Sequence, residues 1–502
     1  MINILILPGT WNYKTLNRFS QVYDIEEVNL VYCFLNKPLF DDFLTVPTNS
    51  NIRFYKFYEG LKERMIKIDK IDLIEKTFVN IGFGELILGD IHHVKFAEIP
   101  SHKRFFNFET YQSSIVSSFN YFLDILTKEK IDVVLYEGYN SHLSKVLYHL
   151  CHEKKIPIIY PFGSMFKDKI TYLHTNDGSS PYLKNVFLQI KKEKNIDLSP
   201  VVLDLIKRVK NNESSYGQVE EILKKKMPES FSAKRLVANI IKQIKRFRKL
   251  NKTISDGINY NKSVENLILY KQSKIHFVFQ QFKRNRNTNW YRKKSKEFMP
   301  GSAVYFMHYQ PEGTTHGISP YFSDEISNIR IISLGLPLGM KLFVREHPNN
   351  HGRRGKKYFQ EILKFYPNVE LLSVNNNPID IIKKASIVFT VSGTVCIESA
   401  IHAKPVIIFS NIYYNILPLV ETCTTPIKLP YLINDLLNKT RINKNENDLK
   451  LVEVFLEAFY RTSFEFDEML MNTEEGMGNE NARISYDEFL KYINVNNLLI
   501  NK

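Results

Sequence analysis

The strongest constraint on the fold is an arrangement that occurs three times between residues 303 and 409. Each time, a short apolar run with strand-like composition ends in a short polar segment. The polar segments are residues 308–315, 345–348 and 392–394. In an open parallel sheet, ligands bind beyond the carboxyl ends of the strands. We therefore expect these segments to form one ligand site, and their His, Arg, Ser and Thr donors suit a ligand that carries phosphate.

Strand-like and helix-like runs alternate in both parts of the chain that flank its middle, which predicts parallel sheets with helices on both faces. We expect an α/β protein with two Rossmann-like domains. Before residue 165, strands are predicted at 4–7, 28–34, 52–57, 133–136 and 156–160, with a helix at 141–153. After residue 300, strands are predicted at 303–307, 341–345, 369–372, 387–391 and 405–409, with helices near 320–335, 355–366, 378–384 and 394–402.

The length of 502 residues exceeds the usual size of one hydrophobic core. We expect an N-terminal Rossmann-like domain over residues 1–179 and a basic helical insertion over 180–300. A C-terminal domain over 301–440 and a helical tail over 441–502 complete the predicted organisation.

Composition narrows the cellular setting. No apolar run approaches the roughly 18–20 residues that span a bilayer. The first nine residues lack a basic segment and a cleavage site, so they predict a strand and a turn instead of a signal peptide. The four cysteines form no CxxC pair, so neither structural zinc nor a disulfide framework is expected. A reducing cytoplasm is the simplest compartment.

The net charge of +15 favours an anionic partner, although a general richness in lysine explains the bulk of it equally well. Residues 234–252 combine eight Lys and Arg residues with an apolar stripe. The stripe consists of Leu236, Val237, Ile240, Ile241, Ile244 and Phe247. This pattern predicts either a helix on an anionic membrane surface or a helix packed on the protein's own core. We expect a cytoplasmic protein, peripheral on the inner face of the membrane, and no nucleic-acid partner.

Arg345, His347 and Pro348 form the second polar segment. A histidine that leaves a strand can donate to a phosphate and stabilise charge on a departing nucleotide, and the alternative is a turn histidine. Ser392, Gly393 and Thr394 stand where a strand turns into a helix, whose N-terminal N–H groups favour phosphate. Their alternative role is plain N-capping.

Glu398 follows one helical turn later, and it is either a ribose ligand or a solvated helix residue. The first polar segment places His308, Gln310 and Glu312 in a loop that can bind a base, a sugar or phosphate. Its alternative is a surface turn. In the N-terminal half, Glu137 follows a predicted strand and is a candidate general base.

Gly138 follows Glu137, and Gly9 and Thr10 follow the first predicted strand, where they can line the acceptor side. Asp168, Asp177 and Glu153 are weaker candidates for the base. No DxD motif follows a predicted strand, so we expect neither a metal nor a cofactor.

Taken together, the segments 308–312, 345–348 and 392–400 resemble the bacterial capsule polysaccharide biosynthesis family, which contains Kdo transferases that use CMP-Kdo. The resemblance covers about residues 300–410. It implies a GT-B fold, in which two domains face a central cleft, and a CMP-sugar donor held by the C-terminal domain.

The resemblance also implies that His347 and Ser392 meet the CMP phosphate, as in similar bacterial sialyltransferases with an HP dipeptide and a Ser/Thr pair. Here Gly393 interrupts that pair. Those enzymes take their base from an acidic-Gly motif, of which Glu137 and Gly138 match the last two positions.

The leading hypothesis is an inverting transfer of Kdo or a related ulosonic acid from a CMP-activated donor to a glycan or glycolipid. Arg345, Arg353 and Arg354 are candidate partners of the donor's carboxylate. One alternative is a CDP-glycerol-type glycerophosphotransferase, and another is a non-catalytic protein that binds polyanions.

Overall fold

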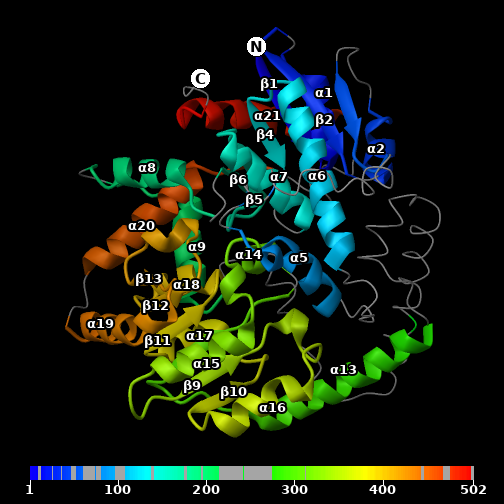
Figure 1. The fold of residues 1–502 in the computed structure, drawn as a ribbon. Coiled ribbons are helices and arrows are strands. Elements are labelled where there is room, and N and C mark those ends of the chain that lie inside the picture. Colours follow the sequence, from blue (N-terminus) through cyan, green and yellow to red (C-terminus); the bar gives the residue numbers. More distant parts are fainter. Residues whose placement is uncertain are drawn as a thin grey trace.

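The structure is a computed structural model. It describes residues 1–8, 13–24, 26–35, 37–46, 52–59, 74, 78, 81–96, 108–136, 141–174, 178–193, 196–213, 241, 274–310, 312–442, 446–466 and 475–498. Two seven-stranded sheets organise these residues into an N-terminal and a C-terminal half. Figure 1 shows the first half above the second.

The N-terminal sheet contains five parallel strands in the order β3-β2-β1-β4-β5, followed by two antiparallel strands, β6 and β14. The strands are β1 (Ile2–Leu7), β2 (Val28–Phe34), β3 (Arg53–Lys56), β4 (Val133–Tyr136), β5 (Ile158–Gly163), β6 (Lys169–Leu173) and β14 (Phe464–Glu465). The first five match predicted strands, and β6 and β14 were not predicted.

Alternate residues of the central strands supply two separate cores. Ile4 and Ile6 pack towards one face of the N-terminal sheet, and Leu5 and Leu7 pack towards the other. Such continuous apolar strands are typical of sheets that are covered on both faces. One face carries α1 (Tyr13–Val22), α2 (Lys37–Phe43) and α21 (Glu475–Val495), and the other carries α5 (Phe83–Phe96), α6 (Phe108–Lys128) and α7 (His142–Glu153).

The C-terminal sheet is entirely parallel, in the order β13-β12-β11-β8-β9-β10-β7. Counted from β8, the order is that of a dinucleotide-binding Rossmann sheet, with the first and fourth strands adjacent. The strands are β7 (Ser295–Lys296), β8 (Ala303–Phe306), β9 (Leu342–Arg345), β10 (Val369–Leu372), β11 (Ile387–Thr390), β12 (Val406–Ile408) and β13 (Val420–Thr422).

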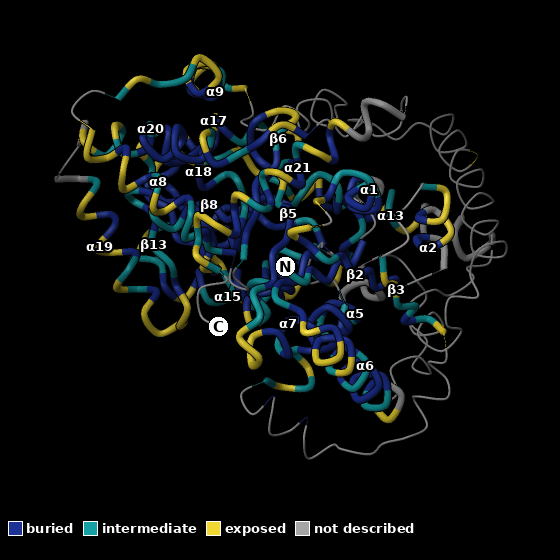
Figure 2. The backbone as a smooth tube through the Cα atoms, turned by 90° about the horizontal axis from the view of Figure 1, so that it is seen from above, coloured by how far each residue is buried: buried dark blue, intermediate teal, exposed yellow. Residues whose placement is uncertain are grey.

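Helices cover both faces of the C-terminal sheet, and Figure 2 shows the buried positions gathered along its inner strands and helix faces. One face carries α13 (Lys274–Lys294), α15 (Glu325–Gly335), α16 (Lys356–Phe365) and α19 (Leu429–Ile442). The other carries α8 (Pro181–Ile190), α9 (Pro200–Lys210), α17 (Pro378–Lys384), α18 (Val395–Ile401) and α20 (Glu446–Arg461). Two Rossmann-like halves of this kind make up the GT-B arrangement, so the predicted fold class is confirmed.

The last part of the chain returns to the N-terminal half. Strand β14 pairs with β6. Helix α21 packs along α1, and Figures 1 and 2 both show it beside the N-terminal sheet. The domain boundaries at 179, 300 and 440 stay a prediction. Residues 214–240 and 242–252, which contain most of the predicted basic amphipathic stripe, lie outside the described residues.

Direct contacts join the two halves. Lys145 of α7 is buried and donates from Nζ to the carbonyl oxygen of Gly317 at 2.8 Å. Gly317 ends the short helix α14 (Gly313–His316). Gly178, in the segment that leaves the first half, accepts a hydrogen bond from the N–H of Tyr413 at 2.9 Å. Its φ of +76° and a gap of 2.8 Å between an added Cβ and Ile318 Cδ1 both require glycine there.

No helix among the described residues combines the length and the apolar character needed to cross a membrane.

Candidate functional site

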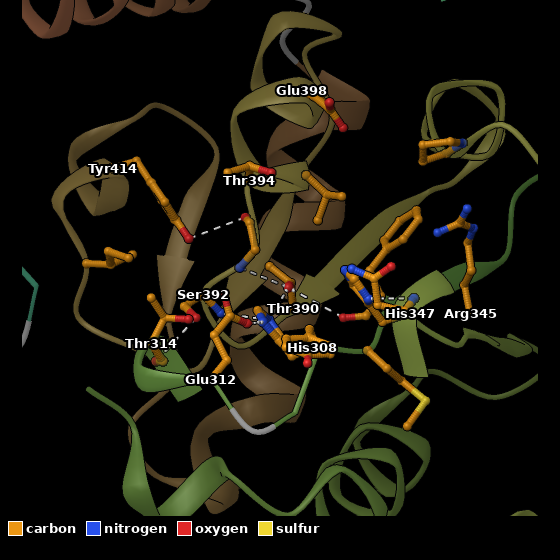
Figure 3. Close-up of a pocket in the computed structure, with 18 of the residues that line it drawn as sticks. His308, Glu312, Thr314, Arg345, His347, Thr390, Ser392, Thr394, Glu398 and Tyr414 are labelled. Carbon is orange, nitrogen blue, oxygen red and sulfur yellow. Dashed lines mark hydrogen bonds and ion pairs between the residues drawn. The ribbon is translucent and has the colours of Figure 1, made fainter. Parts of the chain in front are cut away.

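A pocket of about 370 Å³ opens at the carboxyl edge of the C-terminal sheet. The ends of β8, β9 and β11 and the start of α18 form most of its wall (Figure 3). Phe162 of β5 adds one side chain from the N-terminal half. The predicted residues that line the pocket are His308, Glu312, Arg345, His347, Pro348, Ser392, Gly393, Thr394 and Glu398. The structure thus brings all three polar segments together, as the strand-end rule predicts.

The other predicted residues lie elsewhere. Gln310 is buried behind the pocket, where its Nε2 donates to the carbonyl oxygen of Ser323 at 2.5 Å. Gly9, Thr10, Glu137 and Gly138 lie outside the described residues, so their acceptor-side and catalytic roles stay predictions.

Two weaker candidates for the base are described. Asp168 lies in the turn between β5 and β6, where its carboxylate is 3.7 Å from Lys167 Nζ. Glu153 is exposed at the end of α7. Neither residue lines the pocket. Asp177 lies outside the described residues.

Arg345 places a buried cation in the pocket wall. Its Nη2 donates to the carbonyl oxygens of Val374 and Asn376 at 2.8 and 3.2 Å. Its Nε is buried and forms no hydrogen bond within the described structure. Burial lowers the pKa of Arg345 to about 10, so the group stays charged at neutral pH. Buried polar groups normally have a partner, so this guanidinium does not use all of its donors within the described structure.

His347 is held as a hydrogen-bond donor. It caps the 3₁₀ turn η2 (Pro348–Asn350), and its Nδ1 accepts from the N–H of Asn349 at 3.2 Å. In the neutral ring the proton therefore resides on Nε2. Burial is the main reason that the pKa of His347 is lowered to about 4. At neutral pH this side chain offers an N–H group, not an acidic proton.

His308 organises the turn that follows β11. Its Nε2 accepts from the N–H groups of Val391 and Ser392 at 3.1 and 3.0 Å and lies 2.9 Å from Thr390 Oγ1. The N–H of Gly393 donates to the same hydroxyl at 3.2 Å. The N–H groups of Ser392 and Gly393, which the sequence assigned to a phosphate, are therefore engaged within the protein.

Gly393 is required by close packing. A Cβ at this position would lie 2.6 Å from Thr390 Oγ1, a distance that no side chain tolerates. Tyr414 closes the same turn from the other side by donating from its hydroxyl to the carbonyl oxygen of Gly393 at 3.3 Å (Figure 3). The sequence predicted neither Thr390 nor Tyr414 as a site residue. Tyr414 follows β12, so the strand-end rule would have found it if it had been applied to that strand as well.

Glu398 is only 3% exposed and lines the pocket. The alternative interpretation of this residue, a solvated helix glutamate, is therefore wrong. Its carboxylate also acts on Arg345, whose pKa it raises against the larger effect of burial.

Beneath the pocket, Arg354 joins the ends of β8 and β9. Its guanidinium pairs with Glu346 and donates to the carbonyl oxygen of His308 at 3.0 Å and to Gln310 Oε1 at 2.8 Å. Glu346 in turn accepts from the N–H of His347 at 2.7 Å. The side chain of Arg354 is 1% exposed, so it cannot pair with a donor carboxylate as the sequence suggested.

The two neighbouring carboxylates complete this network. Glu325 accepts from the N–H of His308 at 2.7 Å. Burial raises the pKa of Glu346 to about 7.

The N-terminal half holds a smaller buried polar cluster. His142, at the start of α7, lies 2.7 Å from Asp90 Oδ2 through Nδ1 and 2.7 Å from Ser114 Oγ through Nε2. All three residues are at most 1% exposed, so a substrate does not reach Ser114. The cluster ties α5, α6 and α7 together.

The described structure contains neither a metal site nor a disulfide. Within it, no group of three His, Cys, Asp or Glu side chains has the spacing of a metal site. Each of the four cysteines is buried, and none of them forms a disulfide.

No protein-family model and no curated protein matches this sequence. Several solved structures are similar over much of the chain. The beta Kdo 2,7 transferase KpsC of Thermosulfurimonas dismutans is 12% identical, with 72% of this chain and 88% of that chain covered and a TM-score of 0.34.

Two other similar structures carry different names. UDP-GlcNAc 2-epimerase of Methanocaldococcus jannaschii is 12% identical, with 90% and 99% covered and a TM-score of 0.23. A glycosyltransferase of Rickettsia africae is 10% identical, with 100% and 99% covered and a TM-score of 0.25. Similarity at this level says nothing about activity, and the fold assignment rests on the strand order of the two sheets.

Proposed function

We propose that this chain is a glycosyltransferase of bacterial surface polysaccharide synthesis that uses a CMP-activated ulosonic acid, Kdo or a related sugar. The acceptor is a glycan or a glycolipid. One observation carries the proposal: the pocket at the carboxyl edge of the C-terminal sheet is lined by the cation of Arg345 and by the N–H donor His347. This is the place in an open α/β sheet where nucleotides bind.

The pocket lining supplies one cation for the phosphate of a donor. Of the described residues that line it, only Arg345 is a Lys or an Arg, whereas Glu312 and Glu398 are carboxylates. His347 is neutral at pH 7 because of its low pKa. A CMP-ulosonate carries one phosphate charge and one carboxylate charge, the same total as a UDP-sugar or CDP-glycerol, so the nucleotide screen below decides between these donors.

The pocket residues then receive distinct roles. Arg345 binds the phosphate, and His347 donates its Nε2 proton in a hydrogen bond that strengthens as charge develops on the departing CMP. Glu398 accepts hydroxyl groups of the ribose. Glu137 remains the proposed base for the acceptor hydroxyl, with Gly9, Thr10 and Gly138 beside the acceptor. The donor is a substrate, and the proposed reaction uses neither a metal nor a cofactor.

A thermal-shift screen with CMP, CDP, UDP, UDP-GlcNAc and GDP tests the proposal. A ligand at 100 times its Kd stabilises the folded protein by about 2.7 kcal/mol, so CMP should raise the melting temperature most. The Arg345→Met variant should lose that shift. A larger shift with UDP-GlcNAc would favour a UDP-sugar enzyme, and a larger shift with CDP would favour a glycerophosphotransferase.

Turnover supplies the second test. CMP release from CMP-Kdo in the presence of an acceptor identifies the transfer. The anomeric configuration of the product, read by NMR, decides whether the transfer is inverting, as the sequence predicts. A cytoplasmic location on the inner face of the membrane accompanies this proposal, because CMP-sugars and lipid-linked acceptors meet there.

A further inference from the structure

Helix α13 carries an exposed, strongly basic surface on the outer edge of the C-terminal half (Figure 1). Phe282, Arg286 and Lys293 follow one another at i, i+4 and i+11, so they share one face of the helix. All three are exposed, and Phe282 is 51% exposed. The other exposed cations of this helix and the strand after it are Lys283, Arg292, Lys294 and Lys296.

The opposite side of α13 is fixed to the body of the protein. Tyr291 is buried and donates from its hydroxyl to the carbonyl oxygen of Val344 at 3.2 Å. Asn287 Nδ2 donates to the carbonyl oxygen of Gly352 at 3.1 Å, and Arg284 Nε donates to that of His351 at 3.1 Å. These contacts fix the position and the rotation of α13 on the protein, so its basic face points away from the protein.

These exposed cations form no ion pairs with described acids, although exposed Glu297 follows Lys296 directly. None of the six exposed Lys and Arg side chains between residues 283 and 296 forms an ion pair with a described residue. Elsewhere, exposed cations such as Arg330 and Lys439 do pair with glutamates. The α13 surface thus retains its full positive charge for an outside partner.

One aromatic side chain accompanies the charge. Phe282 is half exposed at one end of the face, whereas Trp290 is only partly exposed and packs against the core of the C-terminal half. Basic residues interleaved with large aromatic side chains suit the boundary between lipid headgroups and acyl chains. Ile241 is the one described member of the apolar stripe in residues 234–252. It lies in a helix and is 51% exposed. At that position the stripe is not part of the core.

We propose that the outward face of α13, formed by Phe282, Lys283, Arg286 and Lys293, docks on a bilayer surface that contains anionic phospholipid. Each basic residue near such a surface contributes about 1 kcal/mol, and Phe282 adds an apolar contact. A convex helix face fits a planar surface better than it fits single-stranded nucleic acid, which binds in grooves. The proposal does not depend on the chemistry of the pocket.

Vesicle flotation with the full chain tests the proposal, with phosphatidylglycerol-containing and pure phosphatidylcholine vesicles in parallel. Binding should require phosphatidylglycerol and should weaken with added salt. In the triple variant Lys283→Gln/Arg286→Gln/Lys293→Gln, the partition coefficient should fall by about 100-fold. Phe282→Ser should weaken binding without changing the charge.

A matched control removes the same charge from other surfaces. Lys154, Lys191 and Lys192 are exposed at the ends of α7 and α8. Their triple Gln variant should bind within about threefold of wild type, because charges far from the contact are screened. Equal binding by wild type and the α13 variant overturns the proposal. So does binding to a random single-stranded RNA that is tighter than binding to vesicles and is lost in the same variant.

Discussion

The two halves of this protein share an order of five parallel strands, yet they bury very different side chains at the strand ends. The C-terminal half buries two arginines and two glutamates there, namely Arg345, Arg354, Glu325 and Glu346. The N-terminal half buries the Asp90, His142 and Ser114 cluster at the start of α7, the helix that follows β4.

This difference shows that the C-terminal half accepts the free-energy cost of burying charged side chains in order to hold them in place. Removing charges from water costs several kcal/mol per ion, and only good hydrogen-bond geometry offsets it. Arg354 meets that condition through contacts with the ends of two strands, whereas Arg345 keeps one donor unpartnered. The same strand order thus occurs in one half with buried charged side chains and in another half with fewer of them. The side chains at the strand ends, not the topology, distinguish the two halves.

The largest expected effect comes from the N-terminal half. Glu137→Gln should reduce transfer by about 10²–10⁴-fold, the usual contribution of a general base. CMP should still stabilise the variant, since the base acts on the acceptor. Asp168→Ala serves as a control, because Asp168 lies away from the pocket. An active Glu137→Gln variant would assign the base to another residue.

Arg354→Met should lower the free energy of unfolding by about 3–5 kcal/mol, because it leaves Glu346 and Glu325 buried without their cation. Asp90→Asn, the matched change in the N-terminal half, should cost only about 1–3 kcal/mol. Urea denaturation measures both.

The double variant Arg354→Met/Glu346→Leu should recover part of the lost stability, since it removes one uncompensated charge. If Arg354→Met is no more destabilising than Asp90→Asn, the contrast between the two halves does not hold.

His347→Ala should reduce transfer by about 10²–10³-fold, the usual loss when one donor to a developing charge is removed. The melting temperature without ligand should stay close to that of the wild type. His152→Ala, an exposed histidine of the N-terminal half, is the control. Turnover close to wild type in both variants would remove His347 from the mechanism.

The smallest expected effect is a dependence of stability on pH. The folded pKa of His347 is lowered to about 4, below its unfolded value, so its contribution to stability is complete above about pH 6.5. Because the two proteins have similar stability at neutral pH, wild type should become less stable than His347→Ala by about 3 kcal/mol as the pH drops from 6.5 to 4. A constant difference across this range would show that burial does not hold the ring neutral.

Much of the fold was predictable because its central strands are apolar runs with clear boundaries. β2, β4 and β10 begin and end at the predicted residues, as does α17, which starts at Pro378. β6 was missed because its alternating polar and apolar residues pair with β5 and with β14, from the far end of the chain. Pairing between such distant segments leaves no local pattern.

The site residues divide in the same way, into those that a local sequence pattern predicts and those that depend on contacts between distant segments. Position at a strand end identified Arg345, His347 and Ser392 as pocket residues, because parallel strands place their carboxyl ends on one edge. The role of Arg354 depends on which carboxylates face it through space, so its sequence position suggested a ligand contact where the structure has an internal ion pair. The use of His308 Nε2 by two backbone N–H groups was hidden for the same reason.

The return of the chain to its first half has a consequence for the order in which the protein is made. The core beneath β1 and β2 includes Phe464, Tyr486 and Phe489, whose rings meet those of Tyr172 and Phe19 in tilted or edge-on contacts. Ribosomes add about 5–20 residues per second, so the N-terminal half waits on the order of tens of seconds for α21. During that interval the apolar side of α1 has no cover. We expect the nascent chain to need a chaperone there, and a gene truncated after α20 to yield an aggregating product.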